Sequence, residues 1–176
     1  MLKFMKTLII SSSLSPTSRS FVLCNQVKSK LEEQGVEVEM IDAREMELKP
    51  CHTEKSKSME ELSKKVAEVD NFVIGMGIHC YSINDGLKII LDNCFSEATG
   101  KFFGIVCAAG GDRSYLSTQH LTQICMNEWR MIQLPRILYA TKNDFDDNQN
   151  LESEDVMERA QIFADEFVNI GNKLVN

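Results

Sequence analysis

Short apolar segments, rich in β-branched and aromatic residues, alternate along the chain with segments of helical periodicity. This alternation predicts a parallel sheet whose crossover helices cover both of its faces. The segment NFVIGMG (71–77) is continuously apolar, as expected for a strand buried on both sides. The predicted strands are residues 6–12, 36–42, 71–77, 101–109 and 136–141, and the predicted helices are 18–34, 58–69, 86–98, 114–128 and 153–174.

The length of the chain indicates one folded unit. A chain of 176 residues with 43% hydrophobic residues fits a single domain, residues 1–176, with one sizeable core. We predict an α/β fold in three layers, with a doubly wound, five-stranded parallel sheet. In such sheets ligands bind beyond the carboxyl ends of the strands, where the strand order reverses. The loops after the first, third and fourth predicted strands therefore form the candidate site.

Charge and cysteine content narrow the class of protein. The formal net charge of −7 disfavours nucleic acid and anionic lipid as partners. No apolar run is long enough to cross a bilayer, and the one near the N-terminus is too short for the core of a signal peptide. We therefore expect no membrane partner. The six cysteines include no C-x-x-C pair, which predicts no metal site and favours a reduced, cytoplasmic protein.

The loop after the first predicted strand, SSSLSPTSRS (11–20), is rich in hydroxyl groups and contains one cation. The amides at the start of the following helix lack intrahelical partners, and the helix dipole is positive there. A phosphate at this position would also meet Ser13, Ser18, Ser20 and Arg19. Neither G-x-G-x-x-G nor a lysine-bearing P-loop is present, so a dinucleotide or ATP γ-phosphate site is not indicated. The alternative is a polar turn in which one serine caps the helix.

Two further loops carry a family resemblance. The segment GIHCYSINDGLKIILD (77–92) follows the third predicted strand, and GGDRS (110–114) follows the fourth. Together with SSLSPTS (12–18), these segments resemble the motifs of NAD(P)H-dependent FMN reductases of flavodoxin-like fold, in the same order and at the same strand ends. Those motifs read G-S-x-R-x-x-S, then roughly P-x-Y-x-x-S-I-P-x-x-L-K-x-x-I-D, then G-G-x-R/G. The resemblance covers essentially the whole chain, and it implies the strand order 2-1-3-4-5 of the flavodoxin-like fold.

The resemblance implies a set of FMN-binding residues. The first loop would hold the ribityl phosphate, the second would lie along the isoalloxazine, and the third would close on its other edge. The implied residues are Ser11, Ser13, Ser18, Arg19 and Ser20, then Ile78, His79, Cys80, Tyr81, Ser82 and Ile83, then Ala109, Gly110, Gly111, Asp112 and Arg113. Ser12, Ser15, Gly77, His79 and Asn84 stand where the family usually has glycine, arginine, proline, tyrosine and proline. These substitutions bear on flavin affinity and on the choice of acceptor.

The implied function is an FMN-dependent NAD(P)H oxidoreductase, with NADH or NADPH as electron donor. Hydride would pass through FMN to a small acceptor such as a flavin, a quinone, an azo or nitro compound, or a metal ion. We expect no catalytic side chain, because the flavin supplies the chemistry. His79 beside Cys80 suggests a nucleophile pair, but no third group orients it.

Other functions of the same fold remain open. A flavodoxin-type electron carrier and a flavin-free scaffold are the alternatives. A receiver-type signalling domain would need acidic residues where this chain has serines and Gly77-Ile78.

The resemblance also implies a homodimer whose partner completes the site. The segment LKIILDNCF (87–95) has more apolar positions than one buried stripe requires, and QICMNEWRMIQL (123–134) adds Trp129 and Met131. Excess apolar surface on two helices predicts a two-fold interface.

Overall fold

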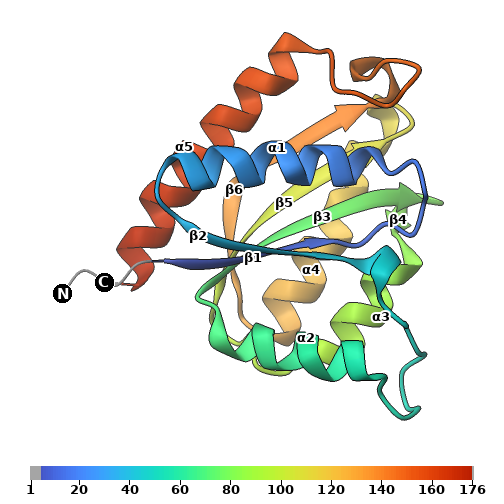
Figure 1. Ribbon diagram of the computed structural model, residues 1–176, viewed down its shortest axis with the longest axis vertical. Coiled ribbons are helices and arrows are strands. Elements are labelled where there is room, and N and C mark those ends of the chain that lie inside the picture. The colour runs from blue at the N-terminus through green and yellow to red at the C-terminus, as the bar shows by residue number, and fades with distance from the viewer. Residues whose placement is uncertain (1–4, 176) are drawn as a thin grey trace.

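The computed structural model describes residues 5–175 and contains one sheet with helices on both faces (Figure 1). The strands of the parallel sheet lie in the order β2-β1-β3-β5-β6, which confirms the predicted order 2-1-3-4-5. A short sixth strand, β4, pairs antiparallel with the end of β3. The bounds are β1 Lys6–Ser11, β2 Glu37–Asp42, β3 Asn71–His79, β4 Ser82–Ile83, β5 Phe102–Ala109 and β6 Ile132–Thr141.

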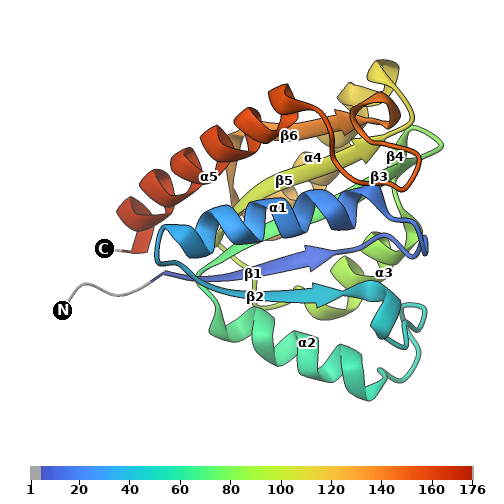
Figure 2. The same cartoon turned by 45° about the horizontal axis from the view of Figure 1, so that its top comes forward.

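The helices form the outer two layers (Figures 1 and 2). One face is covered by α1 (Arg19–Glu33) and α5 (Glu154–Val175), and the other by α2 (Lys57–Glu68), α3 (Asp85–Cys94) and α4 (Gln119–Glu128). Alternate side chains of each central strand enter the two apolar layers, so Ile9 packs toward α1 and α5 while Leu8 and Ile10 pack toward the other helices. The five predicted helices are confirmed, with different bounds.

Three local features differ from the predictions. β6 begins at Ile132, four residues before the predicted start, and Pro135 lies at an irregularity in its pairing with β5. An edge strand tolerates proline at such a point because no ladder partner needs its amide. The predicted helix 114–128 begins instead as a 3-10 helix, η2 (Asp112–Thr118), and becomes α4 at Gln119. β4 is an addition that the sequence reading missed.

Gly104 allows α5 to approach the sheet closely. A Cβ atom at Gly104 would lie 2.6 Å from Cζ of Phe163 and 3.3 Å from Cδ2 of Phe167. We therefore expect Gly104→Ala to lower the free energy of unfolding by about 1–3 kcal/mol through overpacking. Urea denaturation would measure this loss. Gly111→Ala is the control, because its Cβ would meet nothing within 4 Å, and an equal loss in both variants would contradict the packing argument.

Candidate flavin site

The first loop leads from β1 into α1 at the carboxyl edge of the sheet (Figure 2). Ser18 is the N-cap of α1, and its hydroxyl accepts a hydrogen bond from the Phe21 amide at 3.1 Å. The hydroxyls of Ser18 and Ser20 lie 3.1 Å apart, and both residues are buried. The amides of Arg19 and Ser20 precede the first intrahelical hydrogen bond, so they are donors at the positive end of the helix dipole.

A cavity of about 180 Å³ opens beside this helix start. The first loop contributes most of its wall, and the ends of β3 and β5 contribute the rest. Its lining residues are Ser13, Ser15, Thr17, Ser18, Arg19, Ser20, Gly77, Ile78, His79, Ala108, Ala109 and Gly110.

Among the residues that the structure describes, Arg19 is the one cationic residue in the lining of this cavity. Within residues 5–175, the buried Nε atom of Arg19 has no hydrogen-bond partner. The guanidinium lies 5.9 Å from the centre of the Phe145 ring, in the loop that follows β6. The loop that contains Phe145 therefore lies beside the Arg19 side chain. A buried N–H without an acceptor, on a residue that lines a cavity together with serines, fits an anionic group such as a phosphate.

The second loop is a tight hairpin. Ile78 pairs with Ile83 and His79 with Ser82, so Cys80 and Tyr81 form a two-residue turn. Their φ angles are 49° and 58°, which is the left-handed region that such turns require. The turn therefore presents Tyr81, with 63% of its surface exposed, at the edge of the sheet. His79 and Cys80 are exposed as well.

A buried asparagine joins the first two loops. Asn84 is fully buried, and its amide nitrogen donates to the Ser12 carbonyl at 2.8 Å. Its side-chain oxygen accepts from the Ser12 hydroxyl at 3.0 Å and from the Gly77 amide at 3.3 Å. The two departures from the family pattern at Ser12 and Asn84 thus contact each other directly.

A tyrosine of the sheet anchors the third loop by a hydrogen bond. The Tyr139 hydroxyl, at the end of β6, donates to the Gly111 carbonyl at 2.6 Å. Ser114 donates to the same carbonyl at 3.1 Å. Burial, as the largest cause, raises the pKa of Tyr139 above its usual value, so this hydroxyl remains a donor at neutral pH. Tyr115 packs edge-on against Tyr139, with ring centres 5.2 Å apart.

The structure brings about half of the predicted site residues into the cavity wall. Ser13, Ser18, Arg19, Ser20, Ile78, His79, Ala109 and Gly110 line it. The lining also includes Ser15, Thr17, Gly77 and Ala108, which the sequence reading did not assign. Gly77 and Ala108 could have been found from the strand register, because they are paired neighbours at the ends of β3 and β5.

The remaining predicted residues lie around the cavity or beneath it. Ser11 is fully buried at the end of β1 and does not line the cavity. Ile83 packs into the core, and the Ser82 hydroxyl lies 3.1 Å from Nδ1 of His120. The others form an exposed or half-buried rim that consists of Cys80, Tyr81, Gly111, Asp112 and Arg113.

The buried thiols are not suited to nucleophilic chemistry. Burial raises the pKa of Cys24, Cys107 and Cys125 to about 12. For Cys24 the nearby Asp42 adds to this effect. These three thiols are therefore protonated at neutral pH and are unsuited to covalent catalysis.

Comparison with known proteins finds relatives along nearly the whole chain. An NAD(P)H-dependent FAD/FMN reductase of Geobacillus thermodenitrificans is 28% identical over 173 residues, which cover 94% of this chain and 93% of that protein. A solved NADH:FMN oxidoreductase superposes with a TM-score of 0.78 at 16% identity, over 93% of this chain and 88% of the other. An oxidoreductase from Corynebacterium diphtheriae gives a TM-score of 0.75 at 19% identity, over 98% and 97% of the two chains.

The family model of the NADPH-dependent FMN reductases matches residues 5–146, a range that holds β1 to β6 and all three loops of the site. The chain therefore belongs to the NADPH-dependent FMN reductase family, whose members use FMN and NAD(P)H in oxidoreductase chemistry.

Proposed function

We propose that the first loop binds the phosphate of FMN and that the second and third loops hold its ring. The observation that carries this assignment is the cavity at the start of α1, which is lined by Ser18, Ser20 and Arg19. The hydroxyls of Ser18 and Ser20 lie 3.1 Å apart, and the buried Nε of Arg19 has no hydrogen-bond partner among the described residues. When bound, FMN supplies the hydride chemistry between NAD(P)H and a second substrate. The residues of this chain bind and orient the cofactor.

The second and third loops would flank the ring from two strand ends. Ile78 and His79 are the last residues of β3, Ala109 is the last residue of β5, and Gly110 follows it, so the two pairs face the cavity from neighbouring strands. Gly110 leaves open space above its backbone, since a Cβ there would meet nothing within 4 Å. Cys80, Tyr81, Asp112 and Arg113 would form the rim at which a donor or acceptor arrives.

The acceptor is a small molecule that reaches this open rim. A flavin, a quinone, an azo or nitro compound and a metal ion all remain candidates, and NADH and NADPH both remain candidate donors.

A flavin titration tests the assignment. We expect the purified protein to bind FMN more tightly than riboflavin, because the phosphate meets charged and hydroxyl donors worth about 1.5–3 kcal/mol each. Fluorescence quenching of each flavin would measure the two dissociation constants. Anaerobic NADH or NADPH should then bleach the absorption of bound FMN. Bound FMN that neither nucleotide reduces would indicate an electron carrier, and failure to bind FMN would indicate a flavin-free scaffold.

We also propose that the chain forms a two-fold dimer through α3 and α4. An open groove of about 940 Å³ lies between these helices and residues 51–55, and both Lys88 and Glu128 line it. Opposite charges on one face let two copies meet around a two-fold axis. Met126 on α4 is 46% exposed and offers an apolar contact.

The excess apolar surface that the sequence predicted on the two helices is absent at Trp129 and Met131. Trp129 and Met131 are 9% and 2% exposed, so they belong to the core and not to an excess apolar surface. The Trp129 ring packs 5.5 Å from the ring of Phe95, which itself packs against Phe72. Within 87–95, Leu87, Ile90, Leu91, Cys94 and Phe95 are also buried.

Light scattering at micromolar concentration would measure the mass. We expect twice the mass of the chain, and Met126→Lys should shift the protein toward the monomer by placing an extra charge in the interface. Met157→Lys is the matched control, because Met157 is exposed on α5, on the opposite face of the sheet. A wild-type monomer would refute the dimer.

We further propose a cytoplasmic location, on the ground that all six cysteines are free thiols, which suits a reducing compartment. Among residues 5–175, no helix combines the length and apolar character needed to span a membrane.

A further inference from the structure

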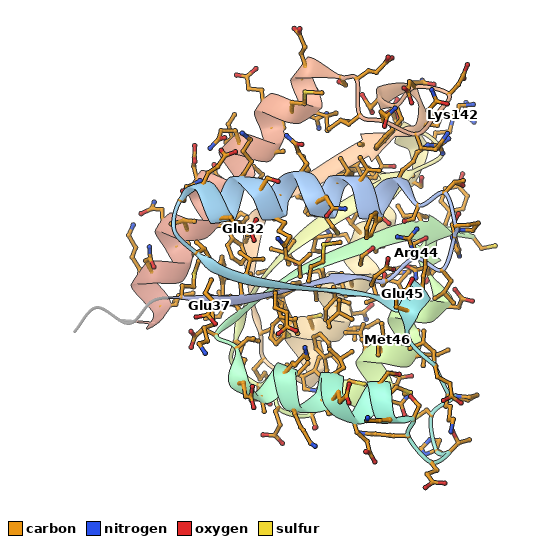
Figure 3. All side chains as sticks on the ribbon, viewed as in Figure 1. Glu32, Glu37, Arg44, Glu45, Met46 and Lys142 are labelled. Atoms are coloured by element: carbon orange, nitrogen blue, oxygen red, sulfur yellow. The ribbon has the colours of Figure 1, made fainter. Side chains whose placement is uncertain are left out.

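Arg44 connects the edge of the sheet to the first loop (Figure 3). It lies in η1 (Ala43–Glu45), the short 3-10 helix that follows β2. Its Nη1 atom donates to the carbonyl of Pro16 at 3.3 Å. Its guanidinium also lies over the ring of Phe21, 4.2 Å from the ring centre, in the first turns of α1. One side chain thus contacts the loop and the helix that together build the proposed phosphate site.

Asp42 fixes the orientation of this arginine. Nε of Arg44 lies 3.0 Å from both carboxylate oxygens of Asp42, and Nη2 lies 2.5 Å from Oδ2. Asp42 also accepts a hydrogen bond from the Arg44 amide at 3.0 Å. Asp42 is the last residue of β2 and is paired with Ser11 of β1, so it fixes the position of the Arg44 guanidinium relative to the sheet. The hydrogen bond to Asp42 raises the pKa of Arg44, so the group remains charged at any ordinary pH.

The segment that Arg44 contacts has mostly local hydrogen bonds. The Ser15 amide donates to the Ser13 hydroxyl at 3.3 Å, and the Thr17 amide donates to the Ser15 hydroxyl at 3.3 Å. Leu14, Ser15, Pro16 and Thr17 are all exposed. An exposed loop with long local hydrogen bonds opens at low free-energy cost unless a rigid element holds it.

We propose that Asp42 and Arg44 form a clamp that positions the first loop to receive the phosphate of FMN. This inference rests on the proposed function of that loop. Arg44 does not line the cavity, so it acts through Pro16 and Phe21 rather than by touching the phosphate. Holding the loop in its binding conformation before the ligand arrives removes an ordering cost from binding.

Flavin affinities of matched variants test the clamp. We expect Arg44→Gln to raise the dissociation constant of FMN about tenfold, since one charge-assisted contact to the loop is lost, and to leave that of riboflavin within about twofold. Asp42→Asn should have a similar effect, and the double variant should be no worse than either single one. Arg136→Gln is the control, because it breaks a bidentate ion pair with Glu166, at 2.8 and 2.9 Å, that lies between β6 and α5.

Hydrogen exchange of the flavin-free protein separates the clamp from the proposed function. Arg44→Gln should speed amide exchange in residues 13–18 about tenfold, while Arg136→Gln should leave it unchanged. Hydrogen exchange can be measured whether or not FMN binds. A wild-type protein that does not bind FMN would therefore refute only the phosphate assignment. Unchanged loop exchange in Arg44→Gln would overturn the clamp, even if FMN affinity fell, because Arg44 would then act through its charge alone. Equal losses of FMN and riboflavin would overturn it as well.

Discussion

Replacing Ser18 and Ser20 together by alanine is expected to weaken FMN binding by at least about two orders of magnitude. The double variant removes two hydroxyl groups that lie 3.1 Å apart at the start of α1, in a cavity that Arg19 also lines. A hydrogen bond to a charged group is worth about 1.5–3 kcal/mol, and about 1.4 kcal/mol corresponds to a factor of ten. Riboflavin lacks the phosphate, so its dissociation constant should barely change. Fluorescence titration of both flavins would give the comparison.

The control must account for the second role of Ser18. Its hydroxyl caps α1 by accepting from the Phe21 amide, so alanine there also costs about 1 kcal/mol of stability. Ser56 caps α2 in the same way by accepting from the Met59 amide, and it lies on the opposite face of the sheet. Ser56→Ala should therefore show a similar loss of stability with no loss of FMN affinity. Equal losses of FMN and riboflavin in the serine variant would show that the loop does not recognise phosphate.

The class of the sheet could be predicted because it depends on a regular local signal. Strand-like and helical segments alternate along the chain, which indicates a parallel, doubly wound sheet, and the family resemblance supplied the order of its strands. The hairpin at Cys80 and Tyr81 could not be predicted in the same way. Both residues have positive φ, yet neither is glycine or asparagine, so the sequence carries no turn signal there.

The geometry of the candidate site could be predicted from the sequence only where it lies within consecutive residues. The serines and Arg19 follow one strand directly, and a helix start is a local feature. The contact between Arg44 and Pro16 joins residues 28 positions apart and depends on how β2 lies against β1. Trp129 was assigned to an interface because the sequence alone does not show whether an aromatic residue at a helix end is buried in the core or exposed on the surface. In the structure Trp129 is buried and packs against Phe95, so it belongs to the core.

We expect Asn84→Ala to lower the free energy of unfolding by about 2–4 kcal/mol. Asn84 is fully buried, and its side chain makes three hydrogen bonds to Ser12 and Gly77. Alanine would leave the Ser12 carbonyl and the Gly77 amide buried without these partners. Urea denaturation of the flavin-free protein would measure the change. Asn93→Ala is the control on the same helix, because Asn93 donates only to the Ile89 carbonyl one turn away.

The same variant should affect flavin binding differently from the serine variant. Asn84 joins the first loop to the start of the second, so its loss should weaken FMN and riboflavin by similar factors. A loss confined to FMN would mean that Asn84 acts on the phosphate loop alone. A stability within about 0.5 kcal/mol of the wild type would contradict the buried network, because exposed substitutions have effects of that size.

A double-mutant cycle tests whether Ser12 and Asn84 replace the family's glycine and proline as a pair. Asn84 has φ −70° and ψ 156°, which a proline can adopt. Ser12→Gly and Asn84→Pro each break the hydrogen bond between the Ser12 hydroxyl and the Asn84 oxygen, so the sum of the single losses counts this bond twice. The double variant should therefore be about 1 kcal/mol more stable than additivity predicts. The backbone effects of glycine and proline on the unfolded chain cancel in the cycle. Additivity within about 0.3 kcal/mol would show that the two departures arose independently of their contact.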